Sequence, residues 1–431
     1  MLQGLHSTAV AGLIALALSA QAPGANAAQE ADTPGERGVR PLVQSMRSGD
    51  SAQDVARRLR ALGLRAMPAL FDVWSKGLDG QALREQEVLV VRGAVLALPG
   101  RQVVTFLEDT LVPSEGSPRS RQNALDVFAE LGDATDIGYM VLLGSYGHGE
   151  RNGRALENAL AMIAARDPRA FDRLRAEWTP PDEWLTPYLL RAVGQSGQRD
   201  GLRVLAPWLF GEGCFTAEVL SQVGNIAQRV GPPFADALVS GVRSHLYSED
   251  VGVRAQATRA TGLLGDVTGM SRLIKLLASS AAQVRSEALS SLQLISGRTF
   301  GADTKRWRSW YLGELAWWEG SWPALREGLH SAEPAEFAQA IRAVVRRRLF
   351  RDLVAEELAP LLFDADPLIR RLACQGLGQL GSHIPLDQLV DCLYDQEEDV
   401  GLSAHQALLR LTSHELPMEP NAWRAALGEH R

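Results

Sequence analysis

Arginine side chains dominate one segment that could bind an acidic partner. The segment RAVVRRRLFR contains Arg342, Arg346, Arg347, Arg348 and Arg351. Arg342 and Arg346 are four residues apart and share a helix face, whereas the next two lie near a predicted turn. Because guanidinium groups pair in forked geometry with carboxylates and phosphates, the cluster predicts a contact for an acidic partner. The alternative is an ordinary solvated helix edge.

Tryptophan side chains form the second candidate binding site. Half of the ten tryptophans fall within sixteen residues, at Trp307, Trp310, Trp317, Trp318 and Trp322. Large rigid aromatic rings are favoured at binding surfaces, so the last three are candidate partner contacts. In the alternative, the rings cover the apolar end of a block of structure. We expect Asp303 or Thr304 to cap a short helix that bears the first two rings.

A weaker copy of this tryptophan segment occurs at the C-terminus. Trp423-Arg424 corresponds to Trp307-Arg308, and Leu411-Thr412 to Ile295-Ser296, both 116 residues apart. This repetition favours the covering role, because every end of a block needs a cover whereas a ligand site is needed once.

Catalytic, cofactor and metal motifs are absent from the sequence. The eight histidines show no HExxH spacing, and the chain lacks GxSxG, GxxxxGK[ST] and CxxC. The acidic run from Asp391 to Asp399 lacks the glycine and ligand spacing of a calcium loop. We therefore predict no catalytic residue, no cofactor and no metal ligand.

Cysteine chemistry is restricted to three residues. Cys374 and Cys392 fall on two predicted antiparallel helices at similar distances from the turn between them, so they could form a disulfide. The alternative is a pair of buried thiols, the common state of small apolar cysteines. We expect Cys214 to be buried.

Internal repetition indicates the elements that position these residues. VRAQATRATGLLGD at Val253 returns 31 residues later as VRSEALSSLQLISG, and IRRLACQGLGQLG at Ile369 returns after 31 as VGLSAHQALLRLT. Small and apolar residues at i, i+3, i+4 and i+7 share one helix face. Gly265, Gly297 and Gly381 are predicted to end these helices in the left-handed conformation, each before a second apolar helix. The pattern predicts an all-α fold, an α-solenoid of about ten stacked helix pairs.

These units resemble HEAT repeats, particularly the short HEAT-like repeats of bilin lyases. The matching residues are Val253, Arg254, Ala257, Ala260, Gly262 and Gly265, and again Ile369, Arg370, Ala373, Leu377, Gly378 and Gly381. The resemblance implies a solenoid, and HEAT-type stacks serve mostly as non-catalytic binding scaffolds.

The domain boundaries follow composition. Residues 1–27 carry no charge, contain an apolar run from Ala9 to Ala20 and end in Ala25-Asn26-Ala27, which predicts a secretory signal peptide; an uncleaved anchor is the alternative. Residues 28–50 are expected to form a disordered tether. HEAT-like blocks are predicted over 51–300 and 331–431, the second with a Trp-bearing cap, separated by a Trp-rich capping insert over 301–330. The solenoid is either continuous or hinged near Gly320.

The net charge and the predicted location of the chain limit the classes of function that we expect. A net charge of −7 argues against general nucleic-acid binding, and no segment after the signal peptide is apolar enough to span a membrane. We predict an exported, periplasmic or secreted scaffold of the cell envelope that binds a protein or peptide. The alternatives are an enzyme or enzyme accessory, lyase-like by resemblance alone, and a purely structural envelope component.

Overall fold

The computed structural model describes residues 36–428, except 147–148, 178–182, 212–213, 332 and 413. The side chains of Glu36, Arg37 and Arg348 also lie outside the description, as do the predicted signal peptide and residues 28–35 of the predicted tether. Within the described residues the fold is all-α, with no strand beyond one isolated bridge between Leu78 and Gln81. The chain divides into two compact units, Met1–Val73 with Gly77–Val95, and Trp74–Lys76 with Leu96–Arg431.

The first unit begins with a helix where a tether was expected. Residues 28–50 were predicted to be disordered, and this is wrong for residues 36–48, which form α2 (Glu36–Ser45) and a 3-10 turn. Val39 and Val43 are four residues apart and fully buried, so they form an apolar face on this helix. The remaining helices of this unit are α3 (Ala52–Ala61), α4 (Met67–Lys76) and α5 (Glu85–Leu96).

A buried ion pair fixes α2 within this unit. Arg47 Nε lies 2.7 Å from Glu87 Oε1, and Glu87 is almost completely buried. The hydrogen bond from Arg47 holds the pKa of the Glu87 carboxyl below its usual range. Composition alone could not reveal this partner, which lies 40 residues away.

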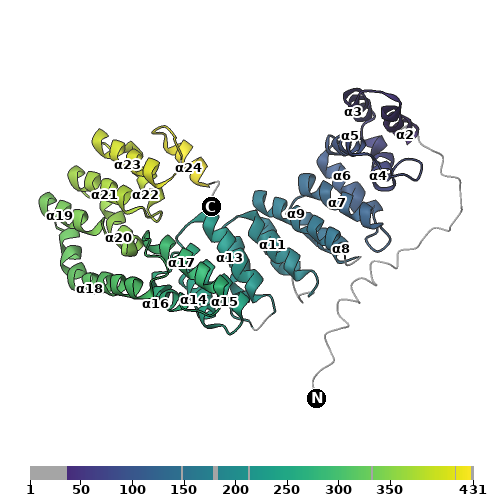
Figure 1. Ribbon diagram of the computed structural model, residues 1–431. Helices are drawn as coiled ribbons and strands as arrows, with labels where there is room; N and C mark the ends of the chain where they lie inside the picture. The colour runs from purple at the N-terminus through teal and green to yellow at the C-terminus, as the bar shows by residue number, and fades with distance from the viewer. Residues whose placement is uncertain are drawn as a thin grey trace, which may run out of the picture. The chain divides into compact units, whose positions relative to one another are not determined.

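The second unit is a stack of helix pairs (Figure 1). The first helices of successive pairs contact one another in order, from α7 to α17 and again from α19 to α23. These first helices are α7 (Pro118–Leu131), α9 (Glu150–Arg166), α11 (Thr186–Ser196), α13 (Thr216–Val230), α15 (Val251–Leu263), α17 (Ala282–Ser296), α19 (Pro334–Val344), α21 (Pro367–Leu380) and α23 (Glu398–Leu411). This neighbour-to-neighbour packing is the predicted α-solenoid.

The second helices are shorter, and several end in a 3-10 turn. They are α8 (Ile137–Ser145), α10 (Arg169–Glu177), α12 (Gly201–Leu205) with η4 (Ala206–Leu209), α14 (Asp236–Ser244) with η5 (His245–Tyr247), α16 (Met270–Leu276), α20 (Arg351–Leu358) with η8 (Ala359–Phe363), and α22 (Leu386–Asp391) with η9 (Cys392–Tyr394). The unit also contains α6 (Gly100–Thr110), α18 (Thr304–Leu329) and α24 (Pro420–Gly428).

The repeat skeleton predicted from the sequence has a clear physical basis. Gly265, Gly297 and Gly381 have φ of 69°, 69° and 74°, which confirms the left-handed helix ends. Small residues allow first helices to approach closely: a Cβ on Gly262 would lie 2.6 Å from Ser291 Cβ, and one on Gly378 would lie 2.9 Å from Ala407 Cα. Neither contact can accommodate even a methyl group without displacing the neighbouring helix.

The recurrent arginine near the start of the first helix stabilises the turn before it. Arg254 Nη1 donates to the Ser248 and Glu249 carbonyls at 2.5 and 3.2 Å. Arg285 and Arg370 make the same two bonds to carbonyls six and five residues upstream. One guanidinium thus satisfies two otherwise unpaired turn carbonyls in each of these repeats.

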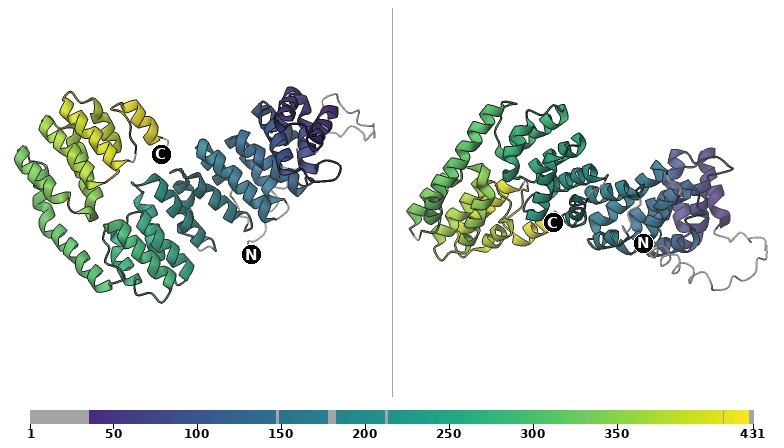
Figure 2. Two further views of the ribbon diagram at one scale, coloured as in Figure 1. Left: turned by 45° about the horizontal axis from the view of Figure 1, so that its top comes forward. Right: turned by 90° about the horizontal axis from the view of Figure 1, so that it is seen from below.

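The long helix α18 replaces the short helix expected after Asp303. Asp303 does cap it, accepting hydrogen bonds from the backbone N–H groups of Lys305 and Arg306 at 3.0 Å. The helix then continues for 26 residues through Gly320 and Pro323 (Figure 2). The expected short helix was wrong because Trp317, Trp318 and Trp322, on either side of Gly320, all find packing partners, which outweighs the helix-breaking preference of Gly320 and Pro323. No single described helix is long and apolar enough to cross a bilayer; the bent pair of α5 and α6 reaches the required length and composition only when the two are counted together.

Candidate interaction surfaces

Two tryptophans from the repeated segments are covering residues. Trp307 and Trp423 are completely buried. The indole N–H of each donates a 2.8 Å hydrogen bond to the carbonyl six residues upstream, that of Gly301 or Pro417. The 116-residue correspondence seen in the sequence therefore extends to geometry, and both rings complete a core at the end of a run of repeats.

Trp318 and Trp322 take part in internal packing. Their rings stack with centroids 4.3 Å apart, and Trp318 also stacks on Phe350 at 4.2 Å. Both side chains are partly buried against the core formed by α19 to α23. This packing occupies ring faces that the sequence suggested for a partner, and it joins α18 to the following repeat.

The arginine cluster is divided by the structure. Arg347 lies 4.4 Å over the Trp317 ring and pairs with the buried Glu314 at 2.7 Å, so Arg347 and Trp317 connect the turn to α18. Arg351 is half-buried and lies 3.8 Å from Asp352.

Among the described side chains of that cluster, Arg342 and Arg346 are the exposed ones. No ion pair is recorded for either among the described side chains, and the side chain of Arg348 lies outside the description. The sequence grouped five arginines by proximity in the chain, but the turn after α19 directs them to different neighbours.

The predicted cysteine pair comes together in the core. Cys374 and Cys392 are buried free thiols, and Cys392 Sγ donates to the Leu362 carbonyl at 3.7 Å. Interaction with the neighbouring Cys392 thiol, together with burial, raises the pKa of the Cys374 thiol. The disulfide remains a prediction. The expected burial of Cys214 is wrong: it is exposed in the turn before α13, where no apolar helix face covers it.

Several histidines are engaged with backbone rather than with reactive groups. The Nε2 atoms of His245, His383 and His405 lie 2.7 to 2.8 Å from the carbonyls of Leu209, Leu411 and Leu416. Exposed His330 pairs with Glu357 at 3.1 Å, beside Arg326. Among the described residues, no group of three metal-ligating side chains converges.

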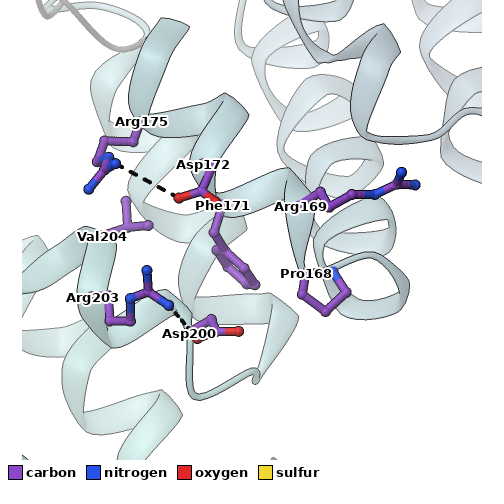
Figure 3. A pocket seen from close by; sticks show the side chains of 8 residues that line it. All are labelled: Pro168, Arg169, Phe171, Asp172, Arg175, Asp200, Arg203 and Val204. Carbon is purple, nitrogen blue, oxygen red and sulfur yellow. Dashed lines mark hydrogen bonds and ion pairs between the residues drawn. The ribbon is translucent and has the colours of Figure 1, made fainter.

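A hollow of about 200 Å³ lies between α10 and α12 (Figure 3). Buried Phe171 lies between two short-range acid–arginine pairs, Asp172 with Arg175 at 3.9 Å and Asp200 with Arg203 at 3.2 Å. The hollow is smaller than typical small-molecule sites, which are about 300–1,000 Å³, and its charged side chains are largely exposed. It offers space for one side chain of a partner.

A larger groove of about 750 Å³ lies within the second unit. It separates the turn at Gly231–Pro233 from the residues around His383 and Leu411. Its principal polar groups are already bonded: Arg199 Nη2 donates to the Gly231 carbonyl at 2.9 Å, and His383 bonds Leu411. Its lining therefore does not favour one ligand chemistry.

A row of exposed aromatic rings is the feature that sequence reasoning missed. Five aromatic side chains in the described chain are more than one-third exposed: Tyr146 at 40%, Phe210 at 66%, Tyr247 at 65%, Phe363 at 60% and Tyr394 at 74%. Each lies at the end of the second helix of its repeat, or one residue beyond it. An aromatic ring is exposed at this end of the second helix in five repeats, and rigid aromatic groups exposed in this way are candidates for partner contacts.

Neighbouring repeats hold two of these rings in place. A Cβ on Gly241 of α14 would lie 3.0 Å from Phe210 Cζ, so this ring rests against the next repeat. Arg272 from α16 lies 4.4 Å over the Tyr247 ring and also donates to the Leu246 carbonyl at 3.3 Å. Phe210 and Tyr247 are thus each held against the repeat that follows.

Comparison with known proteins identifies the C-terminal repeats. Residues 322–409 match the family model for HEAT repeats. This segment is composed of HEAT repeats. It contains α19 to α22 and most of α23, with Phe363 and Tyr394 of the aromatic row.

Solved structures show remote similarity to the chain. An engineered protein is 19% identical over 86% of this chain and 98% of its own, with a TM-score of 0.34. Human deoxyhypusine hydroxylase in complex with glycerol is 15% identical over 65% and 96%, with a TM-score of 0.27. A Kap121p mutant is 12% identical over 91% and 55%, with a TM-score of 0.34. No curated protein matches the sequence.

The sequence did contain a signal for the aromatic row. In four repeats the exposed ring directly follows a buried leucine at the turn. Two of these pairs precede the HEAT segment and two lie within it: Leu209-Phe210 and Leu246-Tyr247, then Leu362-Phe363 and Leu393-Tyr394. The Leu-aromatic pair could have been aligned between repeats. Its exposure could not, because that depends on how the 3-10 turn directs the second side chain.

Proposed function

We propose that this chain is a non-catalytic scaffold of the cell envelope that holds a protein or peptide partner along the row of exposed aromatic rings. The recurrence of an exposed ring at one repeat position is the observation that carries this proposal. Rigid aromatic side chains are enriched among the residues that dominate binding energy. A stack of repeats presents them on one continuous support.

The contacts of histidine and tryptophan side chains support the non-catalytic part of this proposal. His245, His383 and His405 bond backbone carbonyls, and the fully buried tryptophans complete cores. Export rests on residues 1–27 alone, whose apolar run and Ala25-Asn26-Ala27 ending fit a signal peptide.

A photocrosslinking experiment tests the scaffold. The full chain is expressed with p-benzoylphenylalanine at position 247 or 394, and in a matched control at Leu353, which is 51% exposed on α20. We expect the same protein partner to be captured from both ring positions and not from position 353. Equal capture from all three positions, or no capture from either ring position, would contradict the proposal. Fractionation of the cells before crosslinking tests the envelope location.

A charge-reversal variant tests the second predicted contact. Changing Arg342 and Arg346 together to Glu alters exposed side chains for which no ion pair is recorded among the described residues, so the fold should be retained. If these arginines also bind the partner, crosslinking from position 394 should decrease. Unchanged crosslinking would show that they form an ordinary solvated edge.

A further inference from the structure

The two most C-terminal rings of the aromatic row are held together by one arginine. Arg370 Nη1 donates to the carbonyl of Asp364, which follows Phe363, at 2.8 Å. The same guanidinium makes two 2.8 Å hydrogen bonds to the carboxylate of Asp395, which follows Tyr394. The turns bearing the two rings are therefore fixed side by side.

These rings lie in an acidic part of the chain. Asp364, Asp366, Asp395, Glu397, Glu398 and Asp399 lie in the two turns or at the adjoining helix start. No lysine or arginine occurs from residue 372 to residue 409. Arg370 and Arg371 pair with Asp395 and Asp399, whereas no side-chain partner is recorded for Glu397 or Glu398 within the described residues. The surface around Phe363 and Tyr394 is therefore negative.

Another repeat of this chain shows which group such a ring accepts. At the equivalent position Tyr247, the chain supplies its own cation, and the Arg272 guanidinium lies over the ring face. This attraction between a cation and the negative ring face strengthens when water is excluded. No cation is recorded over Phe363 or Tyr394 in the described structure. These rings are 60% and 74% exposed, so their faces are open to a cation from another molecule.

We propose that Phe363, Tyr394 and the acids of their two turns, the C-terminal aromatic edge, bind an extended cationic segment of the partner protein. This inference rests on the proposed scaffold function and names the chemistry of its partner. Arginine or lysine side chains would lie against the rings and near Glu397 and Glu398, while apolar side chains would cover the remaining ring surface.

The spacing of repeats sets the form of the segment. Packed helices lie about 8–10 Å apart, and an extended chain rises about 3.3 Å per residue. Equivalent side chains of the segment therefore meet successive repeats at every third residue. A suitable probe is the peptide acetyl-(Leu-Arg-Pro)₃-amide, in which proline favours an extended backbone. The matched control is acetyl-(Leu-Glu-Pro)₃-amide.

Fluorescence anisotropy with labelled peptides tests the inference on the full chain. We expect the arginine peptide to bind and the glutamate peptide not to bind, with affinity falling at least tenfold between about 0.05 and 0.5 M salt. Phe363→Ala and Tyr394→Ala should each weaken binding about tenfold or more, because alanine removes the ring that a cation contacts. The double variant Glu397→Gln, Glu398→Gln should weaken it severalfold through charge alone.

Controls separate a specific edge from general attraction. Leu353→Ala removes another exposed apolar side chain and should leave the affinity unchanged. Thermal melts should show that every variant remains folded, since the altered groups are exposed. Binding of both peptides alike, binding that the ring variants do not affect, or no binding of the arginine peptide would each overturn the inference.

The scaffold proposal can fail or survive independently of this result. If a partner crosslinks at position 247 but the arginine peptide does not bind, the scaffold stands and the cationic assignment is wrong. If the peptide binds the C-terminal aromatic edge but no ring position captures a cellular protein, the edge has the proposed chemistry but the scaffold function fails.

Discussion

Replacing Trp423 with alanine should destabilise the C-terminal repeats selectively. The ring is completely buried in the core shared by α21 and α23, its N–H bonds the Pro417 carbonyl at 2.8 Å, and it meets His405 edge-on at 6.0 Å. Truncation of a buried tryptophan costs about 3–5 kcal/mol. Trp423→Phe retains most of the apolar contact but leaves the Pro417 carbonyl without its donor, for a cost of about 1–3 kcal/mol.

Hydrogen exchange with mass spectrometry shows which helices lose stability in the Trp423 variants. In a solenoid each repeat contacts only its neighbours, so α21 to α24 should lose protection while α9 and α11 keep theirs. Trp310→Phe is the matched control, because the buried indole N–H of Trp310 has no hydrogen-bond partner among the described residues and its removal should cost little. Equal losses for the two phenylalanine variants, or a loss spread evenly over the second unit, would refute the reasoning.

Three further outcomes follow from the C-terminal contacts. Arg370→Ala should lower the free energy of unfolding by about 3 kcal/mol or more, because it removes the guanidinium from two turn carbonyls and from the Asp395 carboxylate, which keeps only the Glu397 backbone N–H as a donor. Arg342→Ala should be near neutral, and urea unfolding measures both variants. The hydrogen bonds from Arg370 hold the pKa of Asp395 below its usual range, so this pair's stability is present above about pH 4 and is lost as pH falls through the lowered value. Urea unfolding between about pH 5 and 3 should show a shallower decline for Asp395→Asn than for the unaltered chain, and an equal decline would refute the assignment. Mild oxidation should join Cys374 to Cys392 in the folded protein, because their buried thiols lie close enough to interact, and peptide mapping without reduction should detect that disulfide. Two free thiols after oxidation would contradict the prediction.

The candidate sites show which site assignments can be made from sequence and which cannot. Trp423 was matched to Trp307 because the sequence repeats, and repetition survives folding as equivalent geometry. Arg347 was grouped with Arg346 because the two are adjacent in sequence, but in the structure Arg347 stacks on Trp317 and Arg346 does not. Adjacent residues in a turn point in different directions, so proximity in sequence does not establish a shared surface.

The exposed rings were missed for a related reason. Aromatic residues are ordinarily expected in cores, and Leu393-Tyr394 reads as two apolar residues at a helix end. The 3-10 turn places Leu393 inside and leaves Tyr394 mostly in solvent. No periodicity within a three-residue turn could distinguish them.

The sequence by itself determined the repeat, its left-handed glycine stops and the all-α stack, because these depend on local backbone preference and on an apolar face recurring every helical turn. Only the tertiary structure decided which arginines are engaged, which aromatic rings remain exposed, and that residues 36–48 form a helix paired with Glu87. Those outcomes depend on partners tens of residues away. A side chain's exposure is a property of what packs against it, and local sequence does not contain that information.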